Sequence, residues 1–232
     1  IAGIDSVGFY AIGSQIASTV KLIINSVSKS FSRLFFSKIK ESESRIDIID
    51  KFYNILFFIS LLGLFLILFS NEVIAFLAPK SFEKVGLILS IYIFFHLFSI
   101  VGIINGPQIM YAEKMIYFLP QSIFSIILNI ALNLFLIPKY GAIGAAFSTS
   151  ISQLVVSITL FFFAQKSYHL PLNFVKIIKL YLVLFFFALI SFYIFLLQVD
   201  IIYEIIIKFF LIYIFIYYGI RDNFLSKESI DF

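Results

Sequence analysis

Long apolar stretches, separated by short polar turns, follow one another along almost the whole chain. A helix that crosses the hydrocarbon core of a bilayer needs about 20 mostly apolar residues. Stretches that reach or approach this length span residues 6–40, 52–78, 85–111, 115–137, 142–164, 180–199 and 201–220. The pattern therefore predicts an all-α, polytopic helical membrane protein of about seven helices, the first with a polar extension.

Basic residues in the loops predict the orientation, because Lys and Arg favour the cytoplasmic side of a membrane. Twelve of them fall on one set of alternating loops and three on the other set. The larger group includes six residues between the first two helices: Lys29, Arg33, Lys38, Lys40, Arg45 and Lys51. The bias predicts that the first helix starts outside and that the C-terminus is cytoplasmic.

The first helix carries a polar stripe. At about 100° per residue, its members fall within roughly 80° of one another. They are Ser14, Ser18, Lys21, Asn25, Ser28 and Ser32. Lys21 lies about 18 Å from the outer end at 1.5 Å per residue, and a lysine at that depth costs about 2.5–3.5 kcal/mol. Lys21 is therefore expected either to face a substrate cavity or to pair with an acid elsewhere in the protein.

The helix at 115–137 repeats this pattern without charge. Ser122, Ser125, Asn129 and Asn133 share one face. Asparagines commonly join helices in membranes, and packing is the simpler interpretation, with contact to a substrate as the alternative.

A turn and a run of small residues follow this helix. Pro138 disfavours continuation of the helix, and Gly141 allows the chain to reverse. Small residues then recur every four positions at Gly144, Ser148 and Ser152. This spacing lets another backbone approach closely, so Gly144 and Ser148 are expected to face a neighbouring helix.

Two other helices carry single features of interest. Gly106 and Pro107 interrupt the apolar stretch 85–111, and Pro107 predicts a kink that acts as a hinge or as a simple bend. Glu204 and Lys208 lie in the last stretch in the order that favours a helix ion pair.

The composition narrows the function classes. With 62% hydrophobic and 13% charged residues, the chain is not a soluble domain. The absence of cysteine excludes disulfides and thiolate metal sites, and two histidines cannot build a metal cluster alone. Nucleic acid is a poor partner, because the basic residues are spread over several loops. The sequence has no phosphate-binding glycine loop, nucleophile triad or metal-ligand spacing, so we expect no enzyme activity, catalytic residue, metal or cofactor.

Two stretches resemble a known family. Residues 128–152, LNIALNLFLIPKYGAIGAAFSTSIS, resemble the signature turn of polysaccharide flippases in the multidrug/oligosaccharidyl-lipid/polysaccharide exporter superfamily. Residues 7–31, VGFYAIGSQIASTVKLIINSVSKSF, resemble the second helix of a family half, which typically opens VGxYxxAxxIA. The two matches occur in the family's order and at about its spacing, and they cover the chain from Val7 to about Tyr168.

The resemblance implies the C-terminal lobe of a MATE-like, two-lobed inverted-repeat transporter in the cytoplasmic membrane of a bacterium or archaeon. The sequence begins at Ile1 rather than at methionine, and we expect it to be a piece of a longer protein with an N-terminal lobe. The implied substrate is a lipid-linked (isoprenoid diphosphate) oligosaccharide, moved to the outer leaflet for surface polysaccharides of the O-antigen and lipopolysaccharide kind. Membrane lipids are the other implied partners. The candidate substrate-binding residues are Ser14, Lys21, Asn25, Ser28, Lys29, Arg33, Asn129 and Asn133, and the candidate hinge residues are Gly106 and Pro107.

Three alternatives stay open. A drug/cation antiporter of the same superfamily would favour carboxylates deep in its cavity, and Glu204 is the relevant acid. A membrane-embedded acyl- or glycosyltransferase would use His96 or His169 as a base. A membrane assembly or scaffold protein would have no need of Lys21.

The charge bias predicts that position 43 is cytoplasmic. The chain has no cysteine, so a membrane-impermeant thiol reagent should leave a Glu43→Cys variant unlabelled in intact cells and label it once the membrane is opened. A Ser81→Cys variant, in the next loop, should be labelled in intact cells. Labelling of Glu43→Cys from outside would contradict this orientation.

Overall fold

The computed structural model describes residues 4–41, 44–77, 85–197 and 199–225, and every regular element among them is helical. Positions 43 and 81, chosen above to test the orientation, lie outside these residues. The elements are α1 (Ile4–Lys38), α2 (Ser44–Leu68), α3 (Ser70–Leu77), α4 (Val85–Phe98), η2 (Ser99–Val101), α5 (Gly102–Tyr111), η3 (Met115–Tyr117), α6 (Phe118–Ser167), α7 (Phe174–Leu196) and α8 (Ile201–Arg221).

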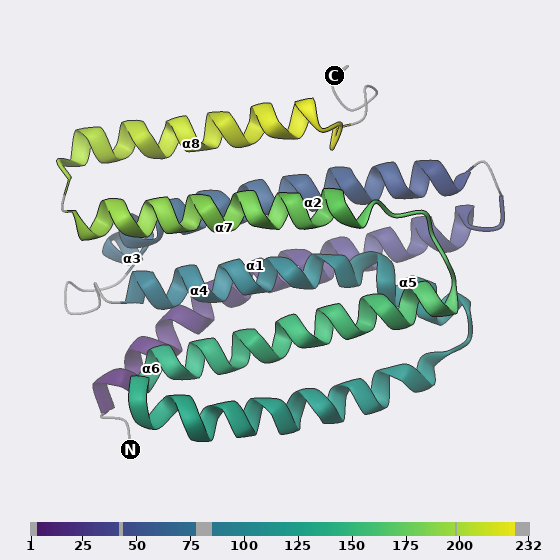
Figure 1. The fold of residues 1–232 in the computed structure, drawn as a ribbon, viewed down its shortest axis with the longest axis horizontal. Coiled ribbons are helices and arrows are strands. Elements are labelled where there is room, and N and C mark those ends of the chain that lie inside the picture. The colour runs from purple at the N-terminus through teal and green to yellow at the C-terminus, as the bar shows by residue number, and fades with distance from the viewer. Residues whose placement is uncertain (1–3, 42–43, 78–84, 198, 226–232) are drawn as a thin grey trace.

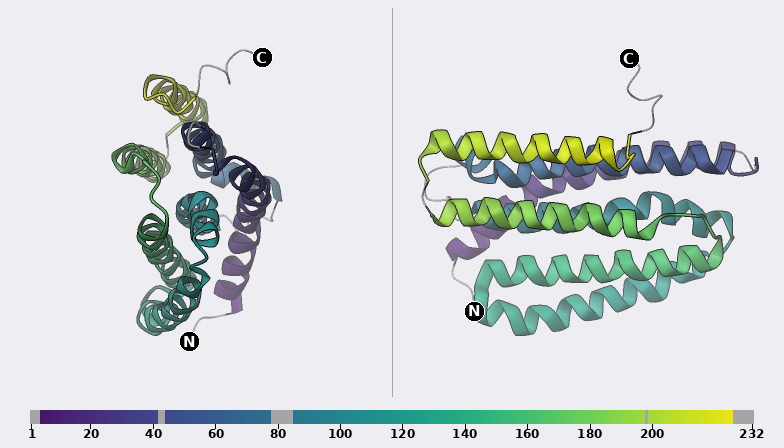
Figure 2. Two further views of the ribbon diagram at one scale, coloured as in Figure 1. Left: turned by 90° about the vertical axis from the view of Figure 1, so that its right-hand side faces the viewer. Right: turned by 45° about the horizontal axis from the view of Figure 1, so that its top comes forward.

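Most of the helices lie side by side in one bundle with long axes that are close to parallel, and α1 crosses them obliquely (Figures 1 and 2). The two arms of α6 lie at one edge of the bundle and α8 lies at the opposite edge. Helix α4 is central, because it contacts α1, α2, α3, α6 and α7. Helices α7 and α8 pack against α2, where the Phe57 and Phe215 rings stack with centroids 5.3 Å apart.

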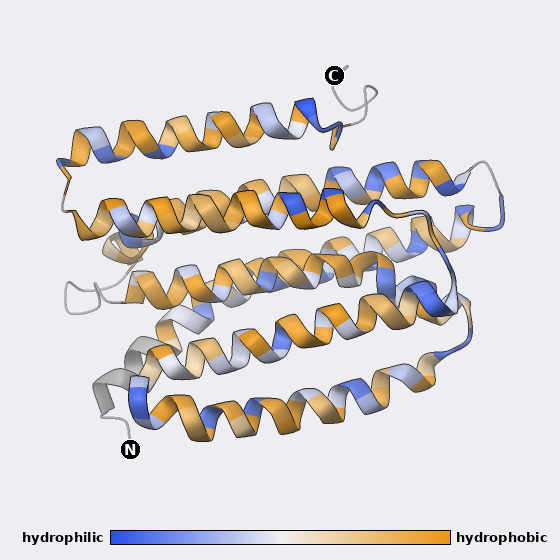
Figure 3. Cartoon of the chain, in the orientation of Figure 1, coloured by the Kyte–Doolittle hydropathy of each residue, from blue (hydrophilic) through white to orange (hydrophobic). Residues whose placement is uncertain are grey.

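The outer surface of the bundle is apolar, as lipid requires. Hydrophobic residues follow most of each helix, and many of the most hydrophilic ones lie near helix ends (Figure 3). Leu134 and Phe135 on α6, for example, are both 72% exposed. In a soluble protein such a surface would aggregate, whereas in a bilayer it contacts acyl chains.

Five helical segments of the described chain are long and apolar enough to cross a membrane: 44–68, 85–111, 115–167, 174–196 and 201–221. The third of these turns back on itself at Gly141, and each of its arms is longer than the roughly 20 residues that a crossing needs (Figure 1). Helix α1 has 35 residues but is less apolar, because it carries the polar stripe. The predicted all-α, polytopic membrane fold is confirmed.

Several helix boundaries differ from those expected from hydropathy. Helix α2 begins at Ser44, eight residues before position 52, since polar turns extend it beyond the apolar stretch. It ends at Leu68, and the short α3 follows. Helix α7 begins at Phe174 because the Asn173 side chain caps it, accepting a hydrogen bond from the Lys176 backbone N–H at 3.0 Å.

The stretch 85–111 is divided by the 3₁₀ turn η2, and Pro107 lies within α5. The departure from α-helical hydrogen bonding therefore lies on the N-terminal side of Pro107. A proline cannot donate to the carbonyl four residues earlier, which weakens that side of a helix.

Gly141 reverses the chain within α6. Helical turns continue past Pro138, and the break falls at Gly141, whose φ of 56° and ψ of −128° suit only glycine. The two arms then approach closely at Gly144, where an added Cβ would lie 2.3 Å from the Leu136 carbonyl oxygen. Ser148 is fully buried and donates a hydrogen bond to the Asn133 side chain. The prediction that Gly144 and Ser148 face a neighbouring helix is confirmed.

Gly144→Ala should lower the yield of folded protein, because backbone rather than a flexible side chain blocks the new methyl group. Overpacking of this kind costs about 1–3 kcal/mol. Gly102→Ala is the matched control, since nothing lies within 4 Å of its added Cβ. Gel filtration and thermal melting of the detergent-solubilised variants provide the measurement, and equal behaviour of the two variants would refute close packing at Gly144.

Candidate functional site

Helix α1 has one face in the core and one face outside it. Ala17, Val20, Ile24, Phe31 and Phe35 are buried, and α1 contacts α4, α5, α6 and α2. The polar stripe lies next to this buried face, with Ser18, Lys21 and Asn25 exposed and Ser14, Ser28 and Ser32 half-buried. The described helices therefore cover the apolar face of α1 and leave much of its polar face open.

The stripe residues differ in how their polar groups are satisfied. Ser14, Ser18 and Ser32 each donate to a backbone carbonyl of α1 itself, at 3.0, 2.6 and 2.8 Å. Lys21 and Asn25 are exposed, and neither forms a hydrogen bond or ion pair with another residue in the part of the chain that the structure describes. Their side chains are available to a ligand or to a partner.

Lys29 and Arg33 continue the basic character of α1 toward its C-terminal end, and both are exposed. Ser28, on the stripe, is half-buried. From Lys21 to Arg33 the helix rises about 18 Å. Three cations thus follow one another along a single helix, from the depth predicted for Lys21 toward the predicted cytoplasmic side.

The structure places Asn129 and Asn133 in the contact between the two arms of α6. Asn129 Nδ2 lies 3.5 Å from Thr149 Oγ1, and Asn133 Nδ2 donates to Asn129 Oδ1 at 3.0 Å. Ser148 donates to Asn133 in turn. The two amides therefore join helices, which is the packing interpretation of the sequence pattern.

The candidate hinge residues lie inside α5. Pro107 is buried, Gly106 is half-buried, and a Cβ added at Gly106 would have no neighbour within 4 Å. Gln108, next to them, donates from Nε2 to the Tyr168 carbonyl at 2.8 Å and so ties α5 to the end of α6. The segment therefore has open space next to Gly106 and is held to the end of α6 by the Gln108 hydrogen bond.

An ion cluster that sequence reasoning missed joins α8 to α3. Lys208 is 1% exposed and lies 2.7 Å from Glu204, which confirms the ion pair expected within α8. It also pairs with Glu72, which is 136 positions away in the sequence. The Phe69 ring centroid lies 5.2 Å from Lys208 Nζ. The only sequence signal for Glu72 was its own charge at the end of an apolar stretch.

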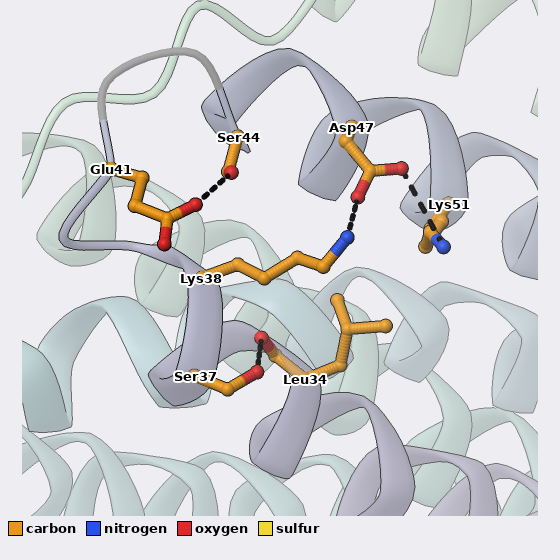
Figure 4. Close-up of polar contacts among 7 residues, drawn as sticks. All are labelled: Leu34, Ser37, Lys38, Glu41, Ser44, Asp47 and Lys51. Carbon is orange, nitrogen blue, oxygen red and sulfur yellow. Dashed lines mark hydrogen bonds and ion pairs between the residues drawn. The ribbon is translucent and has the colours of Figure 1, made fainter.

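A second cluster closes the connection between α1 and α2 (Figure 4). Lys38 Nζ lies 2.5 Å from one oxygen of Asp47, and Lys51 Nζ lies 3.5 Å from the other. Ser44 donates to Glu41 at 2.8 Å. The two helices are thereby held together at the predicted cytoplasmic end.

The two histidines lie in different parts of the fold, and neither is paired with an acidic side chain among the described residues. His96 is half-buried in α4, with its ring centroid 5.9 Å from that of Tyr92. His169 is exposed between α6 and α7, and its Nδ1 lies 3.3 Å from Gln165 Oε1. Among the described residues, no three His, Cys, Asp or Glu side chains gather as a metal site would require.

Comparisons with known proteins agree with an all-α, polytopic membrane fold. No protein-family model matches the chain. The chain is 28% identical over 167 residues to the capsular polysaccharide biosynthesis protein CapF of Staphylococcus aureus, a match that covers 68% of the chain and 42% of that protein. It is similar to the inward closed structure of the lipid II flippase MurJ, with a TM-score of 0.58, 21% identity and coverage of 94% of the chain and 48% of MurJ. The matched region spans less than half the length of either protein.

Lys208→Met should destabilise the protein strongly, because it leaves Glu72 and Glu204 close together without a cation. Breaking a buried ion pair costs about 3–5 kcal/mol. Adding Glu72→Gln and Glu204→Gln should recover much of the lost thermal stability, and Lys179→Met, at an exposed lysine of α7, is the control. Wild-type melting of Lys208→Met alone would show that the cluster does not stabilise the fold.

Proposed function

We propose that this chain is the C-terminal lobe of a flippase that moves lipid-linked oligosaccharide or polysaccharide precursors across the cytoplasmic membrane. The observation that carries the proposal is Lys21, an exposed lysine on a polar helix face, which the sequence predicts to lie about 18 Å inside the membrane. The three acids that form ion pairs in the described chain, Asp47, Glu72 and Glu204, pair with other lysines.

The charge of the substrate class matches the α1 surface. An isoprenoid diphosphate must leave the headgroup region with its negative charge, which requires cations in a water-filled cleft. Lys21, Lys29 and Arg33 provide cations along one helix, and Asn25, Ser14 and Ser28 line the same region with polar groups. Lipid facing this surface would desolvate all of these groups, whereas a hydrated cleft would not.

The comparisons support the same class of function. The relative from S. aureus is a capsular polysaccharide biosynthesis protein, and the protein of similar structure is a lipid II flippase. We place the N-terminal lobe of the full protein opposite the open face of α1, so that the cleft forms between the lobes. Bending at Gly106 and Pro107 would let the lobe change shape during transport, and the C-terminus would lie in the cytoplasm.

The antiporter alternative has less support. It requires carboxylates in the transport cavity, yet Glu72 and Glu204, the acids near the apolar segments of α3 and α8, share Lys208. The transferase alternative relies on His96 or His169, and neither has a carboxylate partner among the residues described.

Lys21→Ala should abolish export of the polysaccharide precursor while membrane abundance stays normal, because an exposed lysine contributes little to packing. Lys21→Arg should retain part of the export, since the positive charge survives. Export and protein level are measured together in cells that carry the full-length gene, with Lys179→Ala as the control that should behave as wild type. Full export by Lys21→Ala at normal abundance would end the proposal, and a fall in abundance would indicate a structural pairing instead.

A further inference from the structure

A groove of about 490 Å³ lies between α1 and α2. Its walls are formed by Ser26, Val27, Ser30, Phe31, Leu34, Lys51, Asn54 and Ile55. Four of these eight residues are polar, but most of the surface of the groove is apolar, and its one charged residue is a lysine. The contact of Lys38 with Asp47 closes the hairpin just beyond the groove, so the groove occupies the predicted cytoplasmic half of the two helices.

The rim of the groove carries surplus positive charge. Asp47 is shared between two lysines, and Lys51 is the more distant of them at 3.5 Å, against 2.5 Å for Lys38 (Figure 4). The Lys51 side chain is 42% exposed. From position 29 to position 51 the chain has six basic and four acidic residues. An anion at the groove therefore meets an ammonium group whose carboxylate partner is already engaged.

The walls below this rim suit a hydrocarbon chain with a polar head. Val27, Leu34 and Ile55 supply apolar surface. The Ser26 hydroxyl donates to the Leu22 carbonyl at 2.9 Å, which leaves its lone pairs to accept. The Ser30 hydroxyl has no hydrogen bond to any residue that the structure describes. A phosphate attached to a lipid chain uses both kinds of surface at once.

We propose that this groove is the loading site for the diphosphate of the lipid carrier and its first isoprenyl units, reached from the cytoplasmic leaflet. The proposal rests on the proposed function in taking a lipid-linked precursor as the cargo. It assigns Lys51, Ser26 and Ser30 to the first contact with the carrier, before the carrier reaches Lys21.

The circumference of α1 connects the groove with the polar stripe. At about 100° per residue, the positions follow one another from Ser30 to Arg33, Lys29 and Lys21 in steps of roughly 60°, 40° and 80°. Arg33 and Lys29 thus lie between the groove and the stripe, and both are exposed. This continuity favours the transported carrier over a resident phospholipid, which would need the rim but not the cations beyond it.

The test measures binding of a sugar-free polyprenyl diphosphate to the purified full-length protein in phosphatidylcholine nanodiscs. Lys51→Gln should weaken binding about tenfold, the effect of losing one charged hydrogen bond. Ser30→Leu should also weaken binding, because it fills the groove without changing the charge. Lys114→Gln, which removes an exposed lysine from the α5–α6 connection, should bind as wild type.

Competition separates the possible sources of the phosphate. Neither phosphatidylglycerol nor inorganic diphosphate, at the concentration of the probe, should displace it from the wild type. Displacement by phosphatidylglycerol would make the groove a general anionic-lipid site and overturn the proposal. Displacement by inorganic diphosphate would show that the apolar walls do not contribute to binding, which would also overturn it.

Failure of the loading site is distinguishable from failure of the proposed function. If the wild type binds the probe and both Lys51→Gln and Ser30→Leu bind it equally well, with unchanged gel-filtration profiles, the loading site is wrong and the flippase proposal stands. If the wild type does not bind the probe at all, the flippase proposal itself fails.

Discussion

The hydrocarbon core of a membrane offers no hydrogen-bond partner, and this constraint organises the polar side chains of the chain. Many such groups inside the bundle are hydrogen-bonded, although the fully buried Asn105 side chain has no partner among the described residues. Asn129 and Asn133 form hydrogen bonds between the two arms of α6. Several serine hydroxyls donate hydrogen bonds to carbonyls of their own helix. Each pairing removes a desolvation cost. Bonds between helices also join them, whereas a serine that bonds the carbonyl four residues earlier tends to bend its own helix.

Packing around α4 determines which face of α1 remains open. The buried residues of α1 are apolar and contact the central helices, so the rotation of α1 about its own axis is set by the core. Once that rotation is set, Lys21 and Asn25 point out of the lobe. The position of the candidate binding surface therefore follows from hydrophobic packing of another face of the same helix. No contact of the polar residues themselves is needed to set it.

Prediction from the sequence succeeded where a local pattern decides the structure. The apolar stretches identified the helices, glycine identified the reversal at position 141, and spacing identified the Glu204–Lys208 pair. It failed where distant parts of the chain meet. Glu72 reaches Lys208 through the packing of α8 beside α3, and the groove at Lys51 depends on the relative rotation of α1 and α2. No periodicity within one helix contains that information.

Lys208 and Lys21 show what an intramembrane lysine requires. Both lie within long helices that are mainly apolar, and either lysine would be costly if it faced lipid. Lys208 is buried, and two carboxylates and an aromatic ring surround its ammonium group. The buried Lys208 therefore has two carboxylate partners. Lys21 has no acid from the described residues and is exposed next to the Asn25 amide, with Lys29 and Arg33 about 12 and 18 Å farther along the helix. An anion such as a diphosphate would supply the negative charge that no described acid places beside Lys21. The contrast between the two lysines is the physical reason to assign Lys208 to the fold and to propose that Lys21 contacts the cargo.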